Sequence, residues 1–450
     1  MNVIASSEGS LYELMCRGKK DTYFYEDSHK SVAPFDTSYH DEEQVIREIR
    51  RIQPTTGVDF GKSIEFPIDI VGDIVDSFTF CIRLPSWLPA NLEKLYPNIQ
   101  TTDVSGNTYG YVNGIAYFLF EKIQLYQDTT VIQEFSGDYL WAQAQIQGTY
   151  AHKFITMKET GSHDGSVVSI GKNAVPGMLR MQLPVIGCGK DDRGFPLVSA
   201  TSHMYKLKCK LRKVEDLVET SGTGNGRPNP WDRSDMKYST ALQTDQAFTT
   251  LQRTQMAPLR VELETRHVFL TNVSKEELRR TPLEIPFKSV YENTFTQTEQ
   301  EANSVAVNRR IDACHPSSRI IWTMRTLEDI QTNRLWKVGQ LYSNIGLTIA
   351  GKTRQANMTP SVWRDITNFA KEDIDSGKEI NTMNWGLGCV APQKYEFRQI
   401  DGTLNFTTAD KATFYISLVA SGPTELRVYV EGWGSFMTDG RGRAEVLSFN

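Results

Sequence analysis

Apolar and polar residues alternate with a period of two in several short segments of the chain. In residues 63–70, isoleucine and phenylalanine fill every second position, and Pro67 falls among the intervening ones. This period is that of a strand with one buried face, and an internal proline favours an edge strand or a bulge. Residues 205–211 alternate in the same way, with lysines at the intervening positions. We therefore expect strands in both segments.

The second half of the chain repeats this pattern. Residues 259–264 and 426–431 each alternate apolar with polar or charged positions. Short strands separated by clusters of Gly, Pro, Asn and Asp are typical of sandwiches and barrels. Strands do not alternate regularly with long helices, which counts against a doubly wound α/β fold. The pattern predicts an all-β protein.

Two segments have helical spacing. Residues 41–52 place Val45, Ile49 and Ile52 on one helical face, with acids first and arginines last, as the helix dipole favours. A second helix is expected after the Thr359–Pro360 cap, ending near Gly377. Each helix is expected to cover the end of a sandwich.

Length and turn composition predict the domain organisation. The chain has 450 residues, which exceeds the usual size of one hydrophobic core. Residues 221–230, SGTGNGRPNP, are typical of an exposed linker. We expect an N-terminal arm over 1–53, a strand-rich unit over 54–218, a linker over 219–245 and a second unit over 246–450.

Charge and cysteine content limit the classes of partner and the compartment that we expect for this chain. The charged fraction is 23% and the net charge is −5, which argues against a chain whose main role is to wrap nucleic acid. We therefore predict no specific nucleic-acid partner. Six widely spaced cysteines form no Cys-x-x-Cys pair, so they are interpreted as packed thiols in a reducing compartment. The first twenty residues lack the pattern of a signal peptide.

Motifs of catalysis are weak or incomplete. Gly57 and Gly61-Lys62 have one residue too few between them for a phosphate-binding loop, and a strand pattern follows them. His163-Asp164 has the letters of a catalytic pair, but it is also an ordinary polar turn. We predict no catalytic, cofactor-binding or metal-binding residue, no cofactor and no enzymatic activity. A hydrolase with a spatially assembled site stays open, because such a site leaves no local pattern.

Two surface features offer other functions. The basic stripe over residues 206–213 could bind the phosphates of lipid or nucleic acid, but a solvated strand face is the favoured interpretation, as it is for Arg279-Arg280 and Arg309-Arg310. Exposed aromatic residues could hold sugars, which would make the chain a carbohydrate-binding or receptor-binding module of tandem sandwiches. The candidates for that role are Trp231, Trp336, Trp385 and Trp433.

The order of several short motifs resembles one known family. These are residues 9–14 and 17–24, Phe60-Gly61-Lys62, Gly72-Asp73-Ile74-Val75, residues 121–125 and 132–141, residues 181–184 and 195–198, the strand at 205–211, residues 395–404 and the ending at 428–430. Together they resemble the double jelly-roll major capsid proteins of nucleocytoplasmic large DNA viruses, as in chlorella viruses and iridoviruses. Two segments, 29–40 and 391–393, depart from that family's pattern.

The resemblance implies a fold and a role. It implies two tandem eight-stranded antiparallel jelly rolls, with a few short helices in insertions and an N-terminal arm. It implies a viral capsid subunit that forms a pseudo-hexameric homotrimer and tiles an icosahedral shell in the virion, assembled in the host cytoplasm. The implied partners are neighbouring capsomers, minor capsid proteins and, peripherally, an inner viral membrane. A minor capsid protein of the same fold is the alternative role.

Overall fold

The structure is a computed structural model in which the chain divides into two compact units, residues 1–44 and 45–450. All described residues lie in the second unit. They are residues 45–85, 108–146, 158–163, 170, 177–188, 194–220, 258–297, 307–314, 316–349, 351–363, 379–385, 402–406, 412–418 and 422–447.

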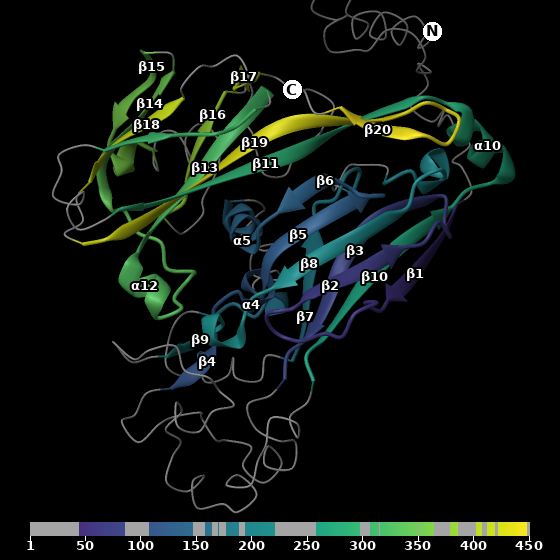
Figure 1. Cartoon of the computed structure of the whole chain (residues 1–450), viewed down its shortest axis with the longest axis horizontal. Helices are drawn as coiled ribbons and strands as arrows, with labels where there is room; N and C mark the ends of the chain where they lie inside the picture. Colours follow the sequence, from purple (N-terminus) through teal and green to yellow (C-terminus); the bar gives the residue numbers. More distant parts are fainter. Residues whose placement is uncertain are drawn as a thin grey trace, which may run out of the picture. The chain divides into compact units, whose positions relative to one another are not determined.

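Eight strands form the first sandwich (Figure 1). They are β1 (Ile46–Ile52), β2 (Ser63–Ile68), β3 (Ile74–Arg83), β5 (Phe120–Gln127), β6 (Thr130–Phe135), β7 (Met178–Leu183), β8 (Tyr205–Leu211) and β10 (Arg260–Phe269). One antiparallel sheet has the order β1-β10-β3-β7 and the other the order β2-β8-β5-β6. The short strands β4 (Tyr109–Tyr111) and β9 (Val218–Thr220) pair separately.

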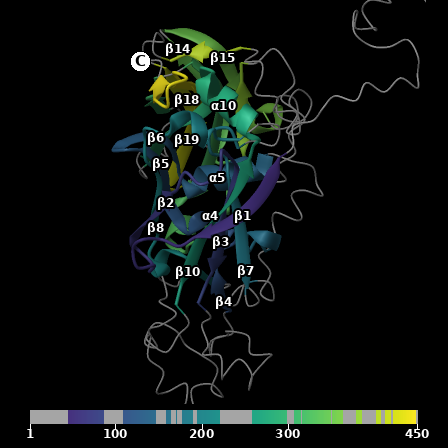
Figure 2. The ribbon, with the colours of Figure 1, turned by 90° about the vertical axis from the view of Figure 1, so that its right-hand side faces the viewer.

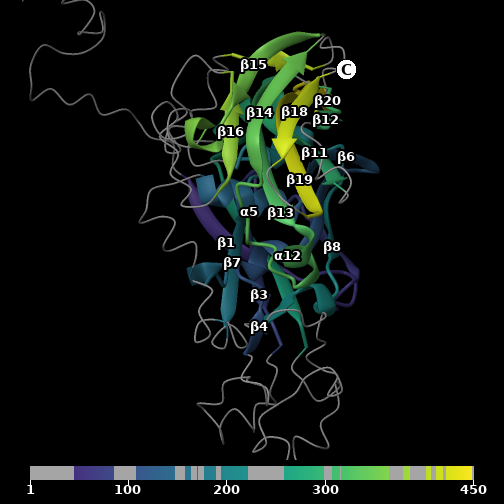
Figure 3. The same cartoon turned by 90° about the vertical axis from the view of Figure 1, so that its left-hand side faces the viewer.

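Eight further strands form the second sandwich, which Figure 3 shows from the side of β13 and β14. They are β11 (Leu283–Gln297), β12 (Val307–Arg310), β13 (Pro316–Thr326), β14 (Tyr342–Ile349), β15 (Lys352–Met358), β16 (Asn381–Asn384), β18 (Thr413–Leu418) and β19 (Thr424–Thr438). The sheets have the orders β11-β19-β13-β16 and β12-β18-β14-β15, and β17 (Leu404–Asn405) and β20 (Ala444–Leu447) extend the first of these.

Both sandwiches have the same strand order. In each, one sheet joins the first, eighth, third and sixth strands, and the other joins the second, seventh, fourth and fifth. This order defines the jelly roll, in which two four-stranded sheets pack face to face. The predicted all-β fold of two tandem eight-stranded jelly rolls is confirmed.

The alternation of apolar and polar residues explains why these segments form strands with one buried face. The apolar positions of β2 and β8, such as Ile64 and Leu207, are buried in the core, whereas the lysines between them lie outward. Pro67 lies opposite Lys206, and β2 is an edge strand of its sheet, as the proline predicted. An edge strand tolerates proline because its outer side lacks a hydrogen-bonded neighbour.

The prediction of a helix over residues 41–52 is wrong for those of its residues that the structure describes, 45–52. Residues 46–52 form strand β1, which pairs with β10 in antiparallel register. The spacing of Ile49 and Ile52 is helical, but in the strand these residues lie on opposite faces. Ile52 packs against the core and Ile49 is exposed. Pairing with a distant strand has overridden the local pattern.

Two strands lie outside the expected domain limits. β1 falls in the expected arm and β10 in the expected second unit, yet both belong to the β1-β10-β3-β7 sheet of the first sandwich. The chain therefore passes between sandwiches through helix α10 (Asn272–Arg280) and not through the segment at 221–230. That segment lies outside the described residues, so its exposure stays a prediction, but it does not connect the two sandwiches because β10, which follows it, belongs to the first.

Helical elements are few and short. Residues 121–125 and 132–141, which resemble a strand pair of the double jelly-roll family, lie in β5 and β6, which do pair, but the second segment ends in the first half of helix α5 (Gly137–Ile146). Helices α4 (Ile115–Phe118) and α12 (Leu327–Gln331) are shorter still. The helix expected after Thr359 begins with a helical turn at 360–363, and its continuation lies outside the described residues. Among the described helices, none has the length and apolarity required to cross a membrane.

Candidate functional site: the junction of the two sandwiches

The outward face of the β11-β19-β13-β16 sheet is buried. One face of β13 and β19 points into the core of the second sandwich, through residues such as Trp322 and Val428. The opposite face carries Ile321 and Tyr429, which belong to the same apolar cluster as the core of the first sandwich. These two strands are therefore buried on both faces, and their outward face forms the junction of the two sandwiches.

Helix α5 of the first sandwich reaches this face, and its start depends on two residues. Ser136 Oγ accepts a hydrogen bond from Tyr139 N at 3.2 Å, which satisfies a free N–H of the first turn. A Cβ at Gly137 would lie 2.1 Å from Tyr117 O and 2.3 Å from Phe120 O. Only glycine allows this approach, which places the next two side chains at the junction.

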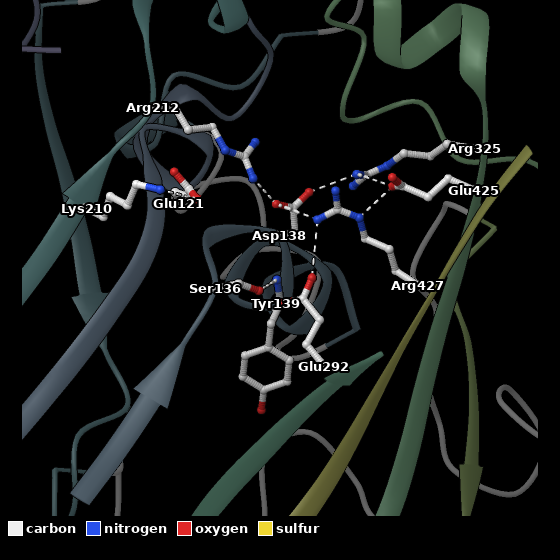
Figure 4. Close-up of polar contacts among 10 residues, drawn as sticks. All are labelled: Glu121, Ser136, Asp138, Tyr139, Lys210, Arg212, Glu292, Arg325, Glu425 and Arg427. Carbon is white, nitrogen blue, oxygen red and sulfur yellow. Dashed lines mark hydrogen bonds and ion pairs between the residues drawn. The ribbon is translucent and has the colours of Figure 1, made fainter. Parts of the chain in front are cut away.

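Asp138 is fully buried among three arginines (Figure 4). Its carboxylate contacts Arg325 Nη1 at 2.8 Å and Arg427 Nη1 at 3.0 Å, both from the second sandwich, and Arg212 from the first. Burial by itself would raise the pKa of Asp138, but the three guanidinium groups outweigh it and hold that pKa well below its usual range. The carboxylate is therefore ionised and links both sandwiches.

Further carboxylates balance these arginines. Glu425 Oε1 lies 2.6 Å from Arg427 Nε and 4.0 Å from Arg325 Nη1. Glu292 Oε1 lies 3.3 Å from Arg427 Nη1, with 28% of its side chain exposed. Burial raises the pKa of Glu292, and the nearby Asp138 carboxylate raises it further, against a hydrogen bond from Ser136.

A second ionic cluster surrounds Glu431, which is fully buried. Arg319 makes a bidentate contact with its carboxylate, with Nε and Nη2 at 3.0 and 2.7 Å. Lys288 Nζ lies 3.1 Å away, and Tyr139 OH of helix α5 donates a hydrogen bond at 2.9 Å. Burial would raise the pKa of Glu431, but Arg319 and Lys288 lower it to about 2.

A third contact joins the sandwiches near α12. Asn333, in a left-handed conformation with φ 60°, donates from Nδ2 to Glu215 O at 2.6 Å and to Val218 O at 2.7 Å. Trp336 Nε1 donates to Glu219 Oε2 at 2.7 Å. These three groups of polar contacts thus hold the two sandwiches in one relative orientation.

A cavity of about 590 Å³ lies at this junction. Its wall includes Lys122 and Glu134, which form an ion pair at 2.6 Å, together with Arg212, Glu292 and Arg427. None of the described residues that line it is a cysteine or histidine. The described part of the chain also holds no group of three or more His, Cys, Asp or Glu side chains placed to bind a metal ion. The ion pairs around Asp138 and Glu431 therefore hold the two sandwiches together.

Of the residues singled out in the sequence, Arg212, Trp336 and His163 lie at the junction. Gly61 is in a turn with φ 74°, and strand β2 follows it where a phosphate-binding loop would be followed by a helix. His163 Nε2 lies 2.8 Å from Glu219 Oε1, at the third contact, whereas Asp164 lies outside the described residues. His163 is therefore joined to a carboxylate from a distant segment.

The basic stripe is a solvated, ion-paired strand face. Lys206 and Lys208 lie 3.6 and 3.4 Å from the two oxygens of Glu65, and Lys210 lies 2.7 Å from Glu121. The two arginine pairs also have acidic neighbours, with Arg279 and Arg280 near Glu276 and Arg310 near Asp312. The interpretation of residues 206–213 as a solvated strand face is confirmed for Lys206, Lys208 and Lys210, but it is wrong for Arg212, which is 13% exposed and contacts the buried Asp138.

The tryptophans and cysteines are mostly packed. Trp433 is 8% exposed and lies under Lys288, and Trp385 packs edge-on against Phe406. Trp231 lies outside the described residues. The interpretation of the cysteines as packed thiols is confirmed for Cys81, Cys188 and Cys209, whereas Cys314 is exposed.

Two eight-stranded jelly rolls in one chain make this a double jelly-roll protein. Among solved structures it is similar to VP54 of PBCV-1, fitted into a reconstruction of the virophage Sputnik, with a TM-score of 0.67 and 12% identity over 92% of this chain and 100% of that one. It is also similar to the Faustovirus major capsid protein, with a TM-score of 0.65 and 10% identity over 97% of each chain. These likenesses show a shared fold. No family model and no curated protein matches the sequence.

Proposed function

We propose that this protein is a structural capsid subunit of a large DNA virus, assembled as a pseudo-hexameric homotrimer that tiles an icosahedral shell. The observation that supports this most is the match over 92% or more of this chain and 97% or more of two capsid proteins. A match of that extent includes both sandwiches and their connection. It therefore favours the role of the whole architecture and not that of one module.

The junction supports the same role. A shell subunit must hold its two sandwiches in a fixed relation, because each presents surfaces to different neighbours. Fully buried charges such as Asp138 and Glu431 meet that need, since any displacement would leave them unpaired at a cost of several kcal/mol. The proposal gives the chain a structural role and no catalytic one.

The remaining partners follow from this role. Trimers would contact neighbouring capsomers and minor capsid proteins, and the shell would lie over an inner membrane that it touches only peripherally. The place of the protein would be the virion, after assembly in the host cytoplasm. Many weak contacts suffice for a shell because each trimer makes several at once.

The experiment that tests the proposal is light scattering on the purified chain. The chain mass is 51.0 kDa, so we expect a particle of three times that mass. Negative-stain images of the same sample should show a hexagonal outline. A stable monomer at micromolar concentration would contradict the trimer, and specific binding on a glycan array by such a monomer would favour the carbohydrate-binding alternative.

A further inference from the structure

Three buried side chains on the outward face of β13 and β19 have polar atoms without a hydrogen-bond partner. These atoms are Thr323 Oγ1, Arg325 Nε and Nη2, and Tyr429 OH. Thr323 is 2% exposed, Arg325 1% and Tyr429 0%. Nearly all buried polar atoms in folded proteins are paired, because an unpaired one keeps the full cost of leaving water. Four such atoms on one face indicate a partner that the described residues do not supply.

The three side chains occupy neighbouring positions between the two ionic clusters. Strand alternation places Thr323 and Arg325 on the same face of β13, and the register sets Tyr429 diagonally opposite Thr323. Arg325 belongs to the cluster around Asp138, and Glu431 follows Tyr429 by two residues on β19. We call Thr323, Arg325 and Tyr429 the donor set.

Helices α4 and α5 of the first sandwich cover the donor set from the other side. The ring of Tyr139 on α5 lies 5.6 Å from that of Tyr429, and the Arg325 guanidinium lies 5.9 Å from the ring centroid of Phe118 on α4. In Figure 2, α5 lies close to β19, where the second sandwich meets the first. The donor set is therefore enclosed between the sandwiches, and a partner for it has to be small.

The chemistry of the donor set favours an anion. Arg325 Nε and Nη2 can only donate hydrogen bonds, whereas the hydroxyl groups of Thr323 and Tyr429 can donate or accept them. An anion accepts from all four atoms. A water molecule would also need acceptors for its own two hydrogens, and the guanidinium nitrogens offer none.

The charge of the two clusters favours the same choice. Each cation contacts a carboxylate, but the described residues of the clusters include five cations and four carboxylates. The cations are Arg212, Lys288, Arg319, Arg325 and Arg427, and the carboxylates are Asp138, Glu292, Glu425 and Glu431. One monovalent anion balances these charges. A divalent anion would add an uncompensated buried negative charge, which is costly.

We propose that Thr323, Arg325 and Tyr429 bind one small monovalent anion, of the size and charge of chloride, between the two sandwiches. The anion accepts from the same guanidinium that contacts Asp138 at 2.8 Å, so it extends the ionic contact along the sheet toward Glu431. The site is independent of the proposed capsid role, because it rests on the junction within one chain.

Unfolding in two salts tests the site. The full chain is purified in sodium gluconate, whose anion is too large to be enclosed, and is compared at pH 7 with the chain in sodium chloride of the same ionic strength. A ligand that binds only the folded chain lowers the ratio of unfolded to folded protein. We expect urea denaturation to give a ratio about tenfold lower when chloride is at ten times its dissociation constant.

The double variant Thr323→Val and Tyr429→Phe removes both hydroxyl groups with little change in volume. Neither hydroxyl has a partner among the described residues, so the variant should be as stable as the wild type in gluconate, but its gain in chloride should be several-fold smaller. Tyr205→Phe is the matched control. The OH of Tyr205 is also buried and unpartnered, but its charged neighbour is the Asp128 carboxylate, so the full effect of chloride should remain.

Crystals of the wild-type chain grown in sodium bromide locate the ion directly. The anomalous scattering of bromide should give a peak within hydrogen-bonding distance of the donor set. Without that peak the donor set holds water only, and the proposal is overturned, whether or not the double variant folds. A peak without any effect of chloride on unfolding would mean binding at crystal concentration only and would also overturn it. So would a gain in chloride that the folded double variant keeps in full, because the stabilising ion would then lie elsewhere.

Discussion

Two fully buried carboxylates, Asp138 and Glu431, determine much of the chemistry at the junction. A buried carboxylate is costly unless its partners surround it, and here arginines from different strands do so. Removing such a carboxylate leaves several cations without their anion. Removing an exposed carboxylate has little effect, because solvent already screens its ion pair.

Asp138→Asn is therefore expected to be strongly destabilising. The amide keeps the volume but leaves three guanidinium groups without their anion, which should cost about 3 kcal/mol of unfolding free energy. Urea denaturation followed by tryptophan fluorescence measures this. The matched control is Asp59→Asn, whose carboxylate is 39% exposed and 3.7 Å from Lys62, and it should cost less than about 0.5 kcal/mol. Equal losses in the two variants would refute this account of Asp138.

Low pH should lower the unfolding free energy of the protein because Glu431 becomes protonated. Its pKa is about 2 in the folded state, against 4.5 for an ordinary glutamate. A lowered folded-state pKa gives stability that is fully present above pH 4.5 and is lost as pH falls toward 2. The shift corresponds to about 3 kcal/mol.

Denaturation curves at pH 7, 5 and 3 test this expectation. Wild-type stability should fall between pH 5 and 3, and Glu431→Gln, less stable at pH 7, should show a smaller fall over that interval. If Glu431→Gln loses as much unfolding free energy between pH 5 and pH 3 as the wild type does, other carboxylates cause the loss.

At the level of elements, the position of α5 depends on Gly137. The start of the helix lies against two backbone carbonyl oxygens, those of Tyr117 and Phe120, which a side chain would strike. Backbone atoms cannot move aside as a flexible side chain can. The helix therefore has one position, and that position brings Asp138 and Tyr139 to the second sandwich.

Gly137→Ala should displace α5 and cost about 2 kcal/mol, in the range measured for overpacked cores. It should also loosen the junction, which hydrogen exchange of β13 and β19 would report as faster exchange. Gly57→Ala is the control, because a Cβ there meets nothing within 4 Å, and its stability should be unchanged or slightly higher. Unaltered exchange in Gly137→Ala would show that α5 is not held by this contact.

The sequence predicted those elements whose pattern is local. The alternation in 205–211 and the proline in β2 were sufficient, because each reports one buried face or one free edge. β1 was missed because its apolar residues fall on both faces, with Ile52 packed on the core and Ile49 exposed on the outward face. Only its pairing with β10, more than two hundred residues away, determines that it is a strand.

The junction could not be predicted in the same way. Asp138 and Arg325 are 187 residues apart, and no local motif marks either of them. One signal was available, since Arg319 and Arg325 stand at the ends of a run in which every residue but Thr323 is apolar. A charged residue at an outward position of such a strand indicates that the outward face is also buried, and that its charge has a partner from elsewhere.

At the level of the whole molecule, the two sandwiches share one apolar cluster. Ile321, Tyr429 and Phe436 of the second sandwich belong to the same cluster of buried residues as the core of the first. Domains joined only by a flexible linker unfold separately, whereas domains with a buried apolar and ionic interface stabilise one another. We therefore expect residues 45–450 to unfold as one cooperative unit.

Calorimetry on the intact chain should accordingly show one principal transition. Ile321→Asp places a charge in the junction and leaves the inward face of β13 unchanged, so the sandwiches should uncouple and melt in two steps, the second sandwich first. The conservative variant Ile321→Val keeps the face apolar and should retain the single transition. Two resolved transitions in the wild type would mean that the ionic clusters around Asp138 and Glu431 align the sandwiches without coupling their stability. The fixed register needed by a shell subunit would then have to come from contacts with neighbouring chains.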